Sequence, residues 1–109
     1  MSDDAPLGTF EEQVILAVLR TREEAYGMAV RREIERASGR DVAIGAVYAT
    51  LDRLEAKGLV ESERTAGKAP RRVFRVTPRG ARALDAFRAL RERLWQGVDL
   101  RPLLGEPAD

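Results

Sequence analysis

The sequence predicts a mainly α-helical fold with one small β-hairpin and a long C-terminal helix. Two observations carry this prediction. Apolar residues recur at helical spacing in three segments before Gly58, and the pattern then changes to that of two short strands before a fourth helical segment opens at Pro78. The length of 109 residues suits one domain with a modest core, so burial against a second copy is an open possibility.

The first helix is expected to begin at Thr9 and to end near Arg20. Thr9 and Glu12 have the spacing of a capping box, in which each side chain reaches the backbone amide of the other residue. Apolar side chains then point nearly all round the helix axis, namely Val14, Ile15, Leu16, Val18 and Leu19. Such a helix must be covered on more than one side.

Two further helices are expected, over about 25–37 and about 45–57. Ser38 and Gly39 end the first of these, and Gly58 caps the second. In the second, Val47, Leu51 and Leu54 follow the i, i+4, i+7 spacing of a buried face. The opposite face is unusually bare, because Gly45, Ala46 and Ala49 stand where exposed helices usually carry long polar side chains.

A hairpin is expected next, from two β-favouring runs at 59–64 and 71–77. The loop between them contains Gly67 and Pro70, and Phe74 and Val76 share the strand face that should meet the helices. Thr77 and Pro78 then predict the start of a helix that runs to about Gly97. Its apolar stripe is wider than a surface helix needs and comprises Ala83, Leu84, Phe87, Leu90, Leu94, Trp95 and Val98. The ends, 1–8 and 101–109, are expected to fray.

The composition argues against catalysis and metal binding. The chain has no cysteine and no histidine, so the commonest nucleophiles, general bases and transition-metal ligands are missing. Its three serines lie in no nucleophile motif, and no glycine-rich phosphate loop occurs. We therefore expect no enzymatic activity and no cofactor. The lack of a signal peptide, a long apolar run and cysteine favours the cytoplasm.

The near-neutral net charge of +1 conceals one cationic segment. Residues 64–82 hold seven basic side chains and no acidic one, whereas acidic side chains outnumber basic ones on both sides of this segment. Such a local field is typical of a surface that meets a polyanion. A solvated run of charges is the alternative, and the position of the run in the fold decides between them.

The order of three helices, a hairpin and a fourth helix predicts a winged helix-turn-helix domain over 7–77, followed by a dimerisation helix over 78–98. The bare helix at about 45–57 then occupies the recognition position, and the hairpin is the wing, at about 65–72. Small residues would let the backbone enter the major groove of double-stranded DNA, where Arg53 can reach a guanine edge or a phosphate. The candidate DNA-binding residues are Tyr26, Gly45, Ala46, Tyr48, Ala49, Thr50, Arg53, Lys57, Lys68, Arg71 and Arg72. For Tyr26 and Tyr48, packing at the core edge is the alternative.

The wide stripe of the last helix and the all-round apolar first helix are two surfaces left over once a small core is packed. Burial against a symmetry mate would cover both. The predicted dimer interface comprises Val14, Ile15, Val18, Leu84, Phe87, Leu90, Leu94, Trp95 and Val98. Absorption of both helices within one chain is the alternative.

Four blocks of the sequence also resemble the PadR-like winged-helix transcriptional regulators. They read "LGTFEEQVILAVL", "EEAYGMAVRREIE", "IGAVYATLDRLEAKGLVE" and "FRVTPRGARAL", and they span roughly residues 7–95. The resemblance implies a dimeric DNA-binding regulator, usually a repressor, of the short form with a single C-terminal helix. The wing departs from the family pattern, because "GKAPRR" replaces a glycine-rich arginine motif.

Two functional hypotheses therefore stand beside each other. In the first, the chain is a homodimeric repressor that reads a palindrome-like operator. In the second, it is a winged-helix protein-interaction module that does not bind DNA. Some short family members hold flat apolar effectors at an aromatic-lined dimer interface, so Trp95 with Phe87 could bind a planar aromatic small molecule. Plain packing of Trp95 in the interface is the alternative.

Overall fold

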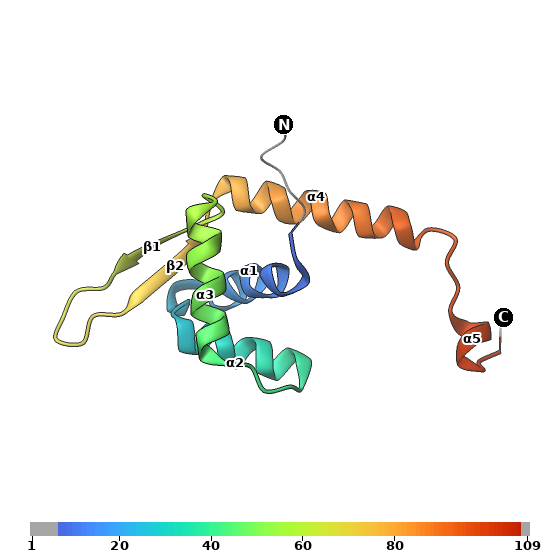
Figure 1. Cartoon of the computed structure of the whole chain (residues 1–109), viewed down its shortest axis with the longest axis horizontal. Coiled ribbons are helices and arrows are strands. Elements are labelled where there is room, and N and C mark those ends of the chain that lie inside the picture. The colour runs from blue at the N-terminus through green and yellow to red at the C-terminus, as the bar shows by residue number, and fades with distance from the viewer. Residues whose placement is uncertain (1–6, 108–109) are drawn as a thin grey trace.

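The computed structural model describes residues 7–107 and confirms a mostly helical chain with one antiparallel hairpin (Figure 1). The elements in chain order are α1 (Thr9–Thr21), the 3-10 turn η1 (Arg22–Glu24), α2 (Gly27–Ser38), α3 (Ile44–Ala56), β1 (Val60–Arg64), β2 (Arg72–Val76), α4 (Pro78–Trp95) and α5 (Arg101–Leu104). None of the described helices is long and apolar enough to cross a membrane.

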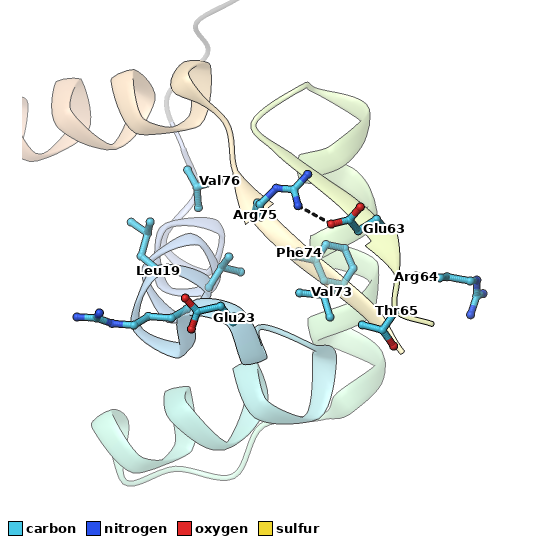
Figure 2. Close-up of a pocket in the computed structure, with 11 residues that line it drawn as sticks. Leu19, Glu23, Glu63, Arg64, Thr65, Val73, Phe74, Arg75 and Val76 are labelled. Atoms are coloured by element: carbon cyan, nitrogen blue, oxygen red, sulfur yellow. Dashed lines mark hydrogen bonds and ion pairs between the residues drawn. The ribbon is translucent and has the colours of Figure 1, made fainter. Parts of the chain in front are cut away.

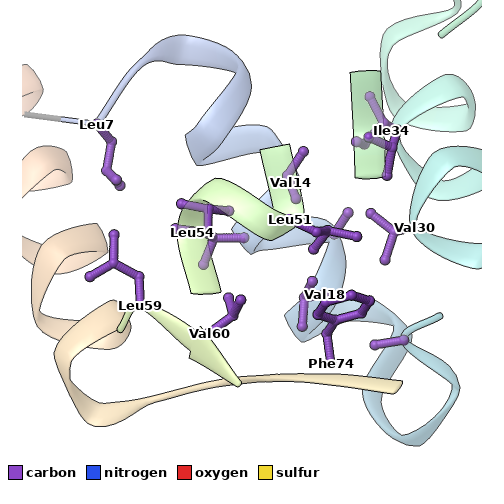
Figure 3. Close-up of a cluster of buried hydrophobic side chains, with 14 residues drawn as sticks. Leu7, Val14, Val18, Val30, Ile34, Leu51, Leu54, Leu59, Val60 and Phe74 are labelled. Atoms are coloured by element: carbon purple, nitrogen blue, oxygen red, sulfur yellow. The ribbon is translucent and has the colours of Figure 1, made fainter. Parts of the chain in front are cut away.

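The core lies where α1, α2 and α3 pack together and β2 closes one side (Figure 3). The predicted inward residues of α3, Val47, Leu51 and Leu54, have no exposed surface. Phe74 of β2 is equally buried among the helices, so the base of the hairpin is part of the core. Burying a side chain of this size stabilises a fold by about 1.5–3 kcal/mol, which fixes the wing to the helical body.

The start of α1 differs from the expected capping box at Thr9 and Glu12. The N-cap is Gly8, whose N–H donates to the Glu11 carboxylate at 2.9 Å, and Thr9 is the first helical residue. Glu12 instead forms an ion pair with Arg91 of α4, at 3.0 Å. The two glutamates therefore have separate contacts, one closing the first turn of α1 and the other holding α4.

The hairpin is joined to the helices by backbone as well as by side chains. Its register pairs Val60 with Val76 at one end and Arg64 with Arg72 at the other. The Phe74 N–H donates to the carbonyl of Ala25 at 2.9 Å, and Tyr26 forms an isolated bridge with Val73. The connection between α1 and α2 thus acts as a short third partner of the sheet.

The long helix α4 begins as predicted, because the Thr77 hydroxyl accepts a hydrogen bond from the Gly80 N–H at 3.0 Å and Pro78 follows the cap. Beyond its first turns, α4 projects away from the body of the chain (Figure 1). The radius of gyration is 16.7 Å, against about 13 Å for a compact domain of 100 residues. The outer part of α4 is therefore without cover from its own chain.

The C-terminal end is more ordered than predicted. Helix α4 ends at Trp95, two residues earlier than expected, and Arg101–Leu104 form the short helix α5 with Gly105 as its left-handed cap. Asp99 supports that turn by accepting hydrogen bonds from the backbone and the guanidinium of Arg101. The remaining ends for which fraying was predicted, residues 1–6 and 108–109, lie outside the described part.

Candidate nucleic-acid interface

The outward face of α3 is bare, as the sequence indicates. Gly45, Ala46 and Ala49 are all exposed, and within residues 7–107 no atom outside the helix lies within 4 Å of the place where a Gly45 side chain would begin. Thr50 corrects the prediction, because it is only 2% exposed. It lies three residues after Val47 and four before Leu54, so it shares their inner face and is not available to DNA.

Tyr48 links the edge of this face to the beginning of α2. Its side chain is 39% exposed, and its ring packs against the buried Gly27. A Cβ added at Gly27 would lie 2.3 Å from Cζ of Tyr48, so any side chain there would require the ring to move. Glycine at this position therefore allows the phenol to lie across the first turn of α2.

Tyr26, directly before α2, is half-buried beneath two arginines. The guanidinium of Arg71 lies 4.3 Å from the centre of its ring, and that of Arg32 lies 6.0 Å away. An Nη of Arg32 also donates to the Tyr26 hydroxyl at 3.2 Å. Sequence reasoning missed Arg32, because Tyr26 precedes α2 in an extended conformation and helical spacing says nothing about their contact.

The basic residues at the end of α3 gather around Glu11. Lys57 lies 2.9 Å and Arg53 3.7 Å from the same carboxylate oxygen, while both cations remain substantially exposed. Burial alone would raise the pKa of Glu11, but the Gly8 amide and the neighbouring cations outweigh it and lower that pKa. The sequence contains no signal for this contact, which joins residues 46 positions apart.

The two neighbouring arginines of the wing lie in different surroundings. Arg72 faces α3, where its guanidinium donates to Asp52 at 2.8 Å and also to Glu55. Arg71 is exposed and lies on Tyr26, and neither it nor Lys68 forms an ion pair within the described residues. The contacts of Arg72 differ from the outward role predicted for it.

Arg75, the other cation of β2, is also neutralised, by Glu61 at 3.2 Å and Glu63 at 2.6 Å. A groove of about 660 Å³ lies beside this pair, between the end of α1, η1 and β2 (Figure 2). Leu19, Val73 and Val76 supply apolar walls. Sequence reasoning did not anticipate this groove, since its walls come from segments far apart in the chain.

Comparison with known proteins decides the family. The family described as "Transcriptional regulator PadR-like family" matches this chain over residues 15–86. The chain belongs to this family. It is therefore a PadR-like, DNA-binding transcriptional regulator with a winged-helix fold. This result favours DNA binding over the alternative of a module that binds only proteins.

Individual relatives agree with this membership. Transcriptional regulator Rv3488 of Mycobacterium tuberculosis is 43% identical over 76 residues, which cover 69% of this chain and 70% of the relative. A crystal structure of a PadR family transcriptional regulator from Eggerthella lenta is 33% identical, with a TM-score of 0.64 over 77% of this chain and 75% of that one. The complex structure of hsRosR-S4 gives a TM-score of 0.71 at 27% identity, over 89% and 81% of the two chains.

In this PadR-like regulator, three residues predicted for the dimer interface lie inside the chain's own core. Val14, Ile15 and Val18 are at most 3% exposed, which corrects that part of the prediction. They are covered by the other helices and by β2. Sequence periodicity shows only that a side chain is buried, and not whether its own chain or a partner buries it. Leu16 and Leu19 are the large apolar side chains of α1 that remain exposed.

The predicted interface residues of α4 divide into two groups. Leu84 and Phe87 are half-buried against the chain's own core. Leu90, Leu94 and Trp95 further along α4 are exposed, with Leu94 at 69% and Trp95 at 56%. Val98 is also exposed, but it lies beyond the end of α4 at Trp95 and is not part of the helical stripe predicted for it. The PadR-like chain thus leaves the outer half of the stripe open.

The residues predicted to hold an effector are not brought together within one chain. Trp95 borders a hollow of about 560 Å³ whose other walls are Arg88, Arg91, Glu92 and Gln96. Phe87 is not part of this hollow and lies beneath the Arg91 guanidinium, 5.9 Å from its ring centre. An aromatic effector site at Trp95 and Phe87 stays a prediction.

Proposed function

We propose that this PadR-like regulator is a homodimeric, sequence-specific repressor that inserts α3 into the major groove of a palindrome-like operator. The observation that carries the proposal is the bare outer face of α3, with exposed Tyr48 and Arg53 at its edges. Arg72 contacts Asp52 of α3, so the wing lies next to that helix. Lys68 and Arg71 can then meet the flanking phosphates or the minor groove.

The mechanism follows from the side chains that this face offers. Glycine and alanine let the helix backbone approach the bases closely, and their small apolar surface suits thymine methyl groups. Few polar groups are available to read base edges, so phosphate contacts and DNA shape supply much of the binding free energy. Affinity should therefore fall steeply as the salt concentration rises.

The dimer is proposed from the exposed apolar side chains of α4. Leu90, Leu94 and Trp95 lie on the part of the helix that projects beyond the body, and Leu16 and Leu19 of α1 add to the uncovered apolar surface. A twofold partner can bury such a surface with an identical one. Two copies would then present their α3 helices to half-sites about one helical turn apart, roughly 34–36 Å.

Footprinting on the DNA upstream of the regulator's own gene tests the proposal, because it reports site size and symmetry together. On the protected site, we expect Arg53→Ala and the pair Lys68→Ala with Arg71→Ala each to weaken binding by about 1–3 kcal/mol. Arg93→Ala is the matched control, since Arg93 is an exposed cation of α4 that lines neither the hollow at Trp95 nor the surface beside Leu16 and Leu19. Unchanged binding in both DNA-face variants would refute the proposed interface.

Repression itself needs a separate measurement. A reporter gene driven by a promoter that contains the footprinted site should be less active when the regulator is present. The Arg53→Ala variant should relieve that effect in proportion to its loss of affinity. Higher reporter activity with the wild-type protein would instead identify an activator.

A further inference from the structure

We propose that Arg72 is a positioning residue, which holds the wing against the recognition helix and does not itself contact DNA. The inference rests on the proposed DNA-binding function. It separates Arg72 from its neighbour Arg71, although the two arginines are adjacent in a segment whose cations would all be expected to meet the phosphates.

The hydrogen-bonding groups of Arg72 are directed into the protein. One Nη donates to Asp52 at 2.8 Å, the other donates to Glu55, and Nε donates to the Ser62 hydroxyl at 3.1 Å. The guanidinium carbon also lies 4.7 Å from the centre of the Phe74 ring. Each of the three guanidinium nitrogens therefore has a partner within the protein, which engages three of the five N–H groups.

Ser62 closes the network and makes it a three-element joint. Its hydroxyl donates to the second carboxylate oxygen of Glu55 at 2.7 Å, so β1, β2 and α3 are connected through three side chains. The hydrogen bond from Ser62, followed by that from Arg72, lowers the pKa of Glu55. Burial alone would lower the pKa of Arg72, but the two carboxylates outweigh burial and raise it.

The network also manages charge beside the proposed DNA surface. Asp52 and Glu55 would repel phosphates if they were unpaired, and Arg72 compensates part of their charge. Its planar guanidinium can reach both carboxylates at once, which a lysine ammonium does less well. Arg71, by contrast, is exposed and stacks on Tyr26, without an ion pair among the described residues.

The two neighbouring arginines provide a matched experiment on the footprinted operator, with affinity measured over a series of salt concentrations. Arg71→Gln should reduce the steepness of the salt dependence by about 1.8, the value for one lost phosphate contact in each of the two subunits. Arg72→Gln should weaken binding about tenfold while leaving that slope unchanged, because no phosphate contact is lost. Arg72→Lys should behave like Arg72→Gln, although it keeps the charge.

The carboxylates supply a second, independent readout. In the wild-type background, Asp52→Asn with Glu55→Gln should weaken binding by at least about threefold, although two negative charges near DNA are removed, because the wing is released. In the Arg72→Gln background the same pair should strengthen binding, because only unpaired charges are removed. Thermal unfolding of each variant confirms that the chain is folded when it is assayed.

The outcomes separate this inference from the proposed function. Three outcomes would overturn the positioning role. The first is a salt dependence that Arg72→Gln reduces as much as Arg71→Gln does, and the second is near-wild-type binding by Arg72→Lys. The third is tighter binding by the variant with both carboxylates replaced, in both the wild-type and the Arg72→Gln background. The proposed DNA interface itself fails if neither Arg53→Ala nor Arg71→Gln changes the affinity for the operator.

Discussion

The ring of Tyr48 occupies the space that a side chain on Gly27 would need. The clash would involve the ring carbon Cζ at 2.3 Å and the hydroxyl oxygen at 2.5 Å. Gly27 opens α2, and Tyr48 lies on α3 at the edge of the proposed DNA face. This contact therefore couples the packing of two helices to the orientation of a proposed phosphate-binding side chain.

Gly27→Ala should displace the Tyr48 ring and destabilise the fold by about 1–3 kcal/mol, in the range of other overpacking substitutions. Urea unfolding measures the effect. In a Tyr48→Ala background the same substitution should cost far less, because the clashing ring has been removed. An equal loss in both backgrounds would show that Gly27 is required for another reason.

Gly80→Ala should be more damaging, at about 3 kcal/mol. The added Cβ would lie 2.1 Å from the carbonyl oxygen of Leu59, and backbone cannot swing aside as a side chain can. Gly45→Ala is the control in urea unfolding, because no neighbour in the described part of the chain lies within 4 Å of its Cβ position and alanine is the better helix former. Gly45→Ala should therefore stabilise the fold by up to about 1 kcal/mol.

Ala49→Gln should leave the fold intact and weaken operator binding about tenfold. Ala49 is exposed on α3, and glutamine is a good helix former, so unfolding should be little affected. A long side chain would keep the helix backbone away from the groove. Ala37→Gln, at the exposed end of α2, is the matched control in fluorescence anisotropy with labelled operator. Equal operator affinities for the two variants would show that DNA does not bind at the outer face of α3.

Leu94→Asp should shift the chain from dimer to monomer. Leu94 is 69% exposed on the projecting part of α4, and a carboxylate there would have to be buried in the proposed interface without a partner. Sedimentation equilibrium measures the shift, with Ser38→Asp at the exposed end of α2 as control. A wild-type chain that sediments as a monomer at high concentration would rule out the dimer.

Stability should be nearly constant from pH 6 to 8 and should fall in acid. The chain contains no histidine, the side chain that ordinarily titrates in that range. Gly8 and Lys57 lower the pKa of Glu11 against the opposing effect of burial, and Arg20 lowers that of Glu33. A lowered pKa gives stability that is present above the ordinary value of 4.5 and is lost as the pH falls through the folded value.

Urea midpoints measured from pH 7 to pH 3 check this dependence. Glu11→Gln should be less stable than the wild type at pH 7 and should lose less stability on acidification, because the titrating group is gone. Identical acid profiles for the two proteins would show that Glu11 does not contribute.

The order of elements was predictable because each depends on local periodicity and on turn residues. Pro78 after Thr77 gives the start of α4, and alternating apolar residues place Phe74 toward the core. The cap of α1 was mistaken by one residue, since Gly8 with Glu11 and Thr9 with Glu12 have the same spacing. Tertiary contacts distinguish them, because Glu12 pairs with Arg91 and Glu11 with Lys57.

The surfaces were harder to predict than the elements. An apolar helix has the same pattern whether its own chain or a partner covers it, so Val14, Ile15 and Val18 could not be separated from Leu16 by sequence. Likewise, Arg71 and Arg72 are the same type of residue with the same charge and are neighbours in the chain. Their difference arises because Arg72 reaches Asp52 and Glu55, a contact that depends on how the hairpin lies beside α3.

Because α4 projects away from the body, the proposed DNA-binding face and the proposed dimer surface of α4 are formed by different segments of the chain. The proposed DNA face lies within residues 26–72, whereas the exposed large apolar side chains of α4 begin at Leu90. A chimera that receives segment 26–72 from a relative should therefore acquire a new operator preference and keep its old pairing partner. Paralogues in one cell could diverge in the same way, with recognition and assembly evolving through separate substitutions.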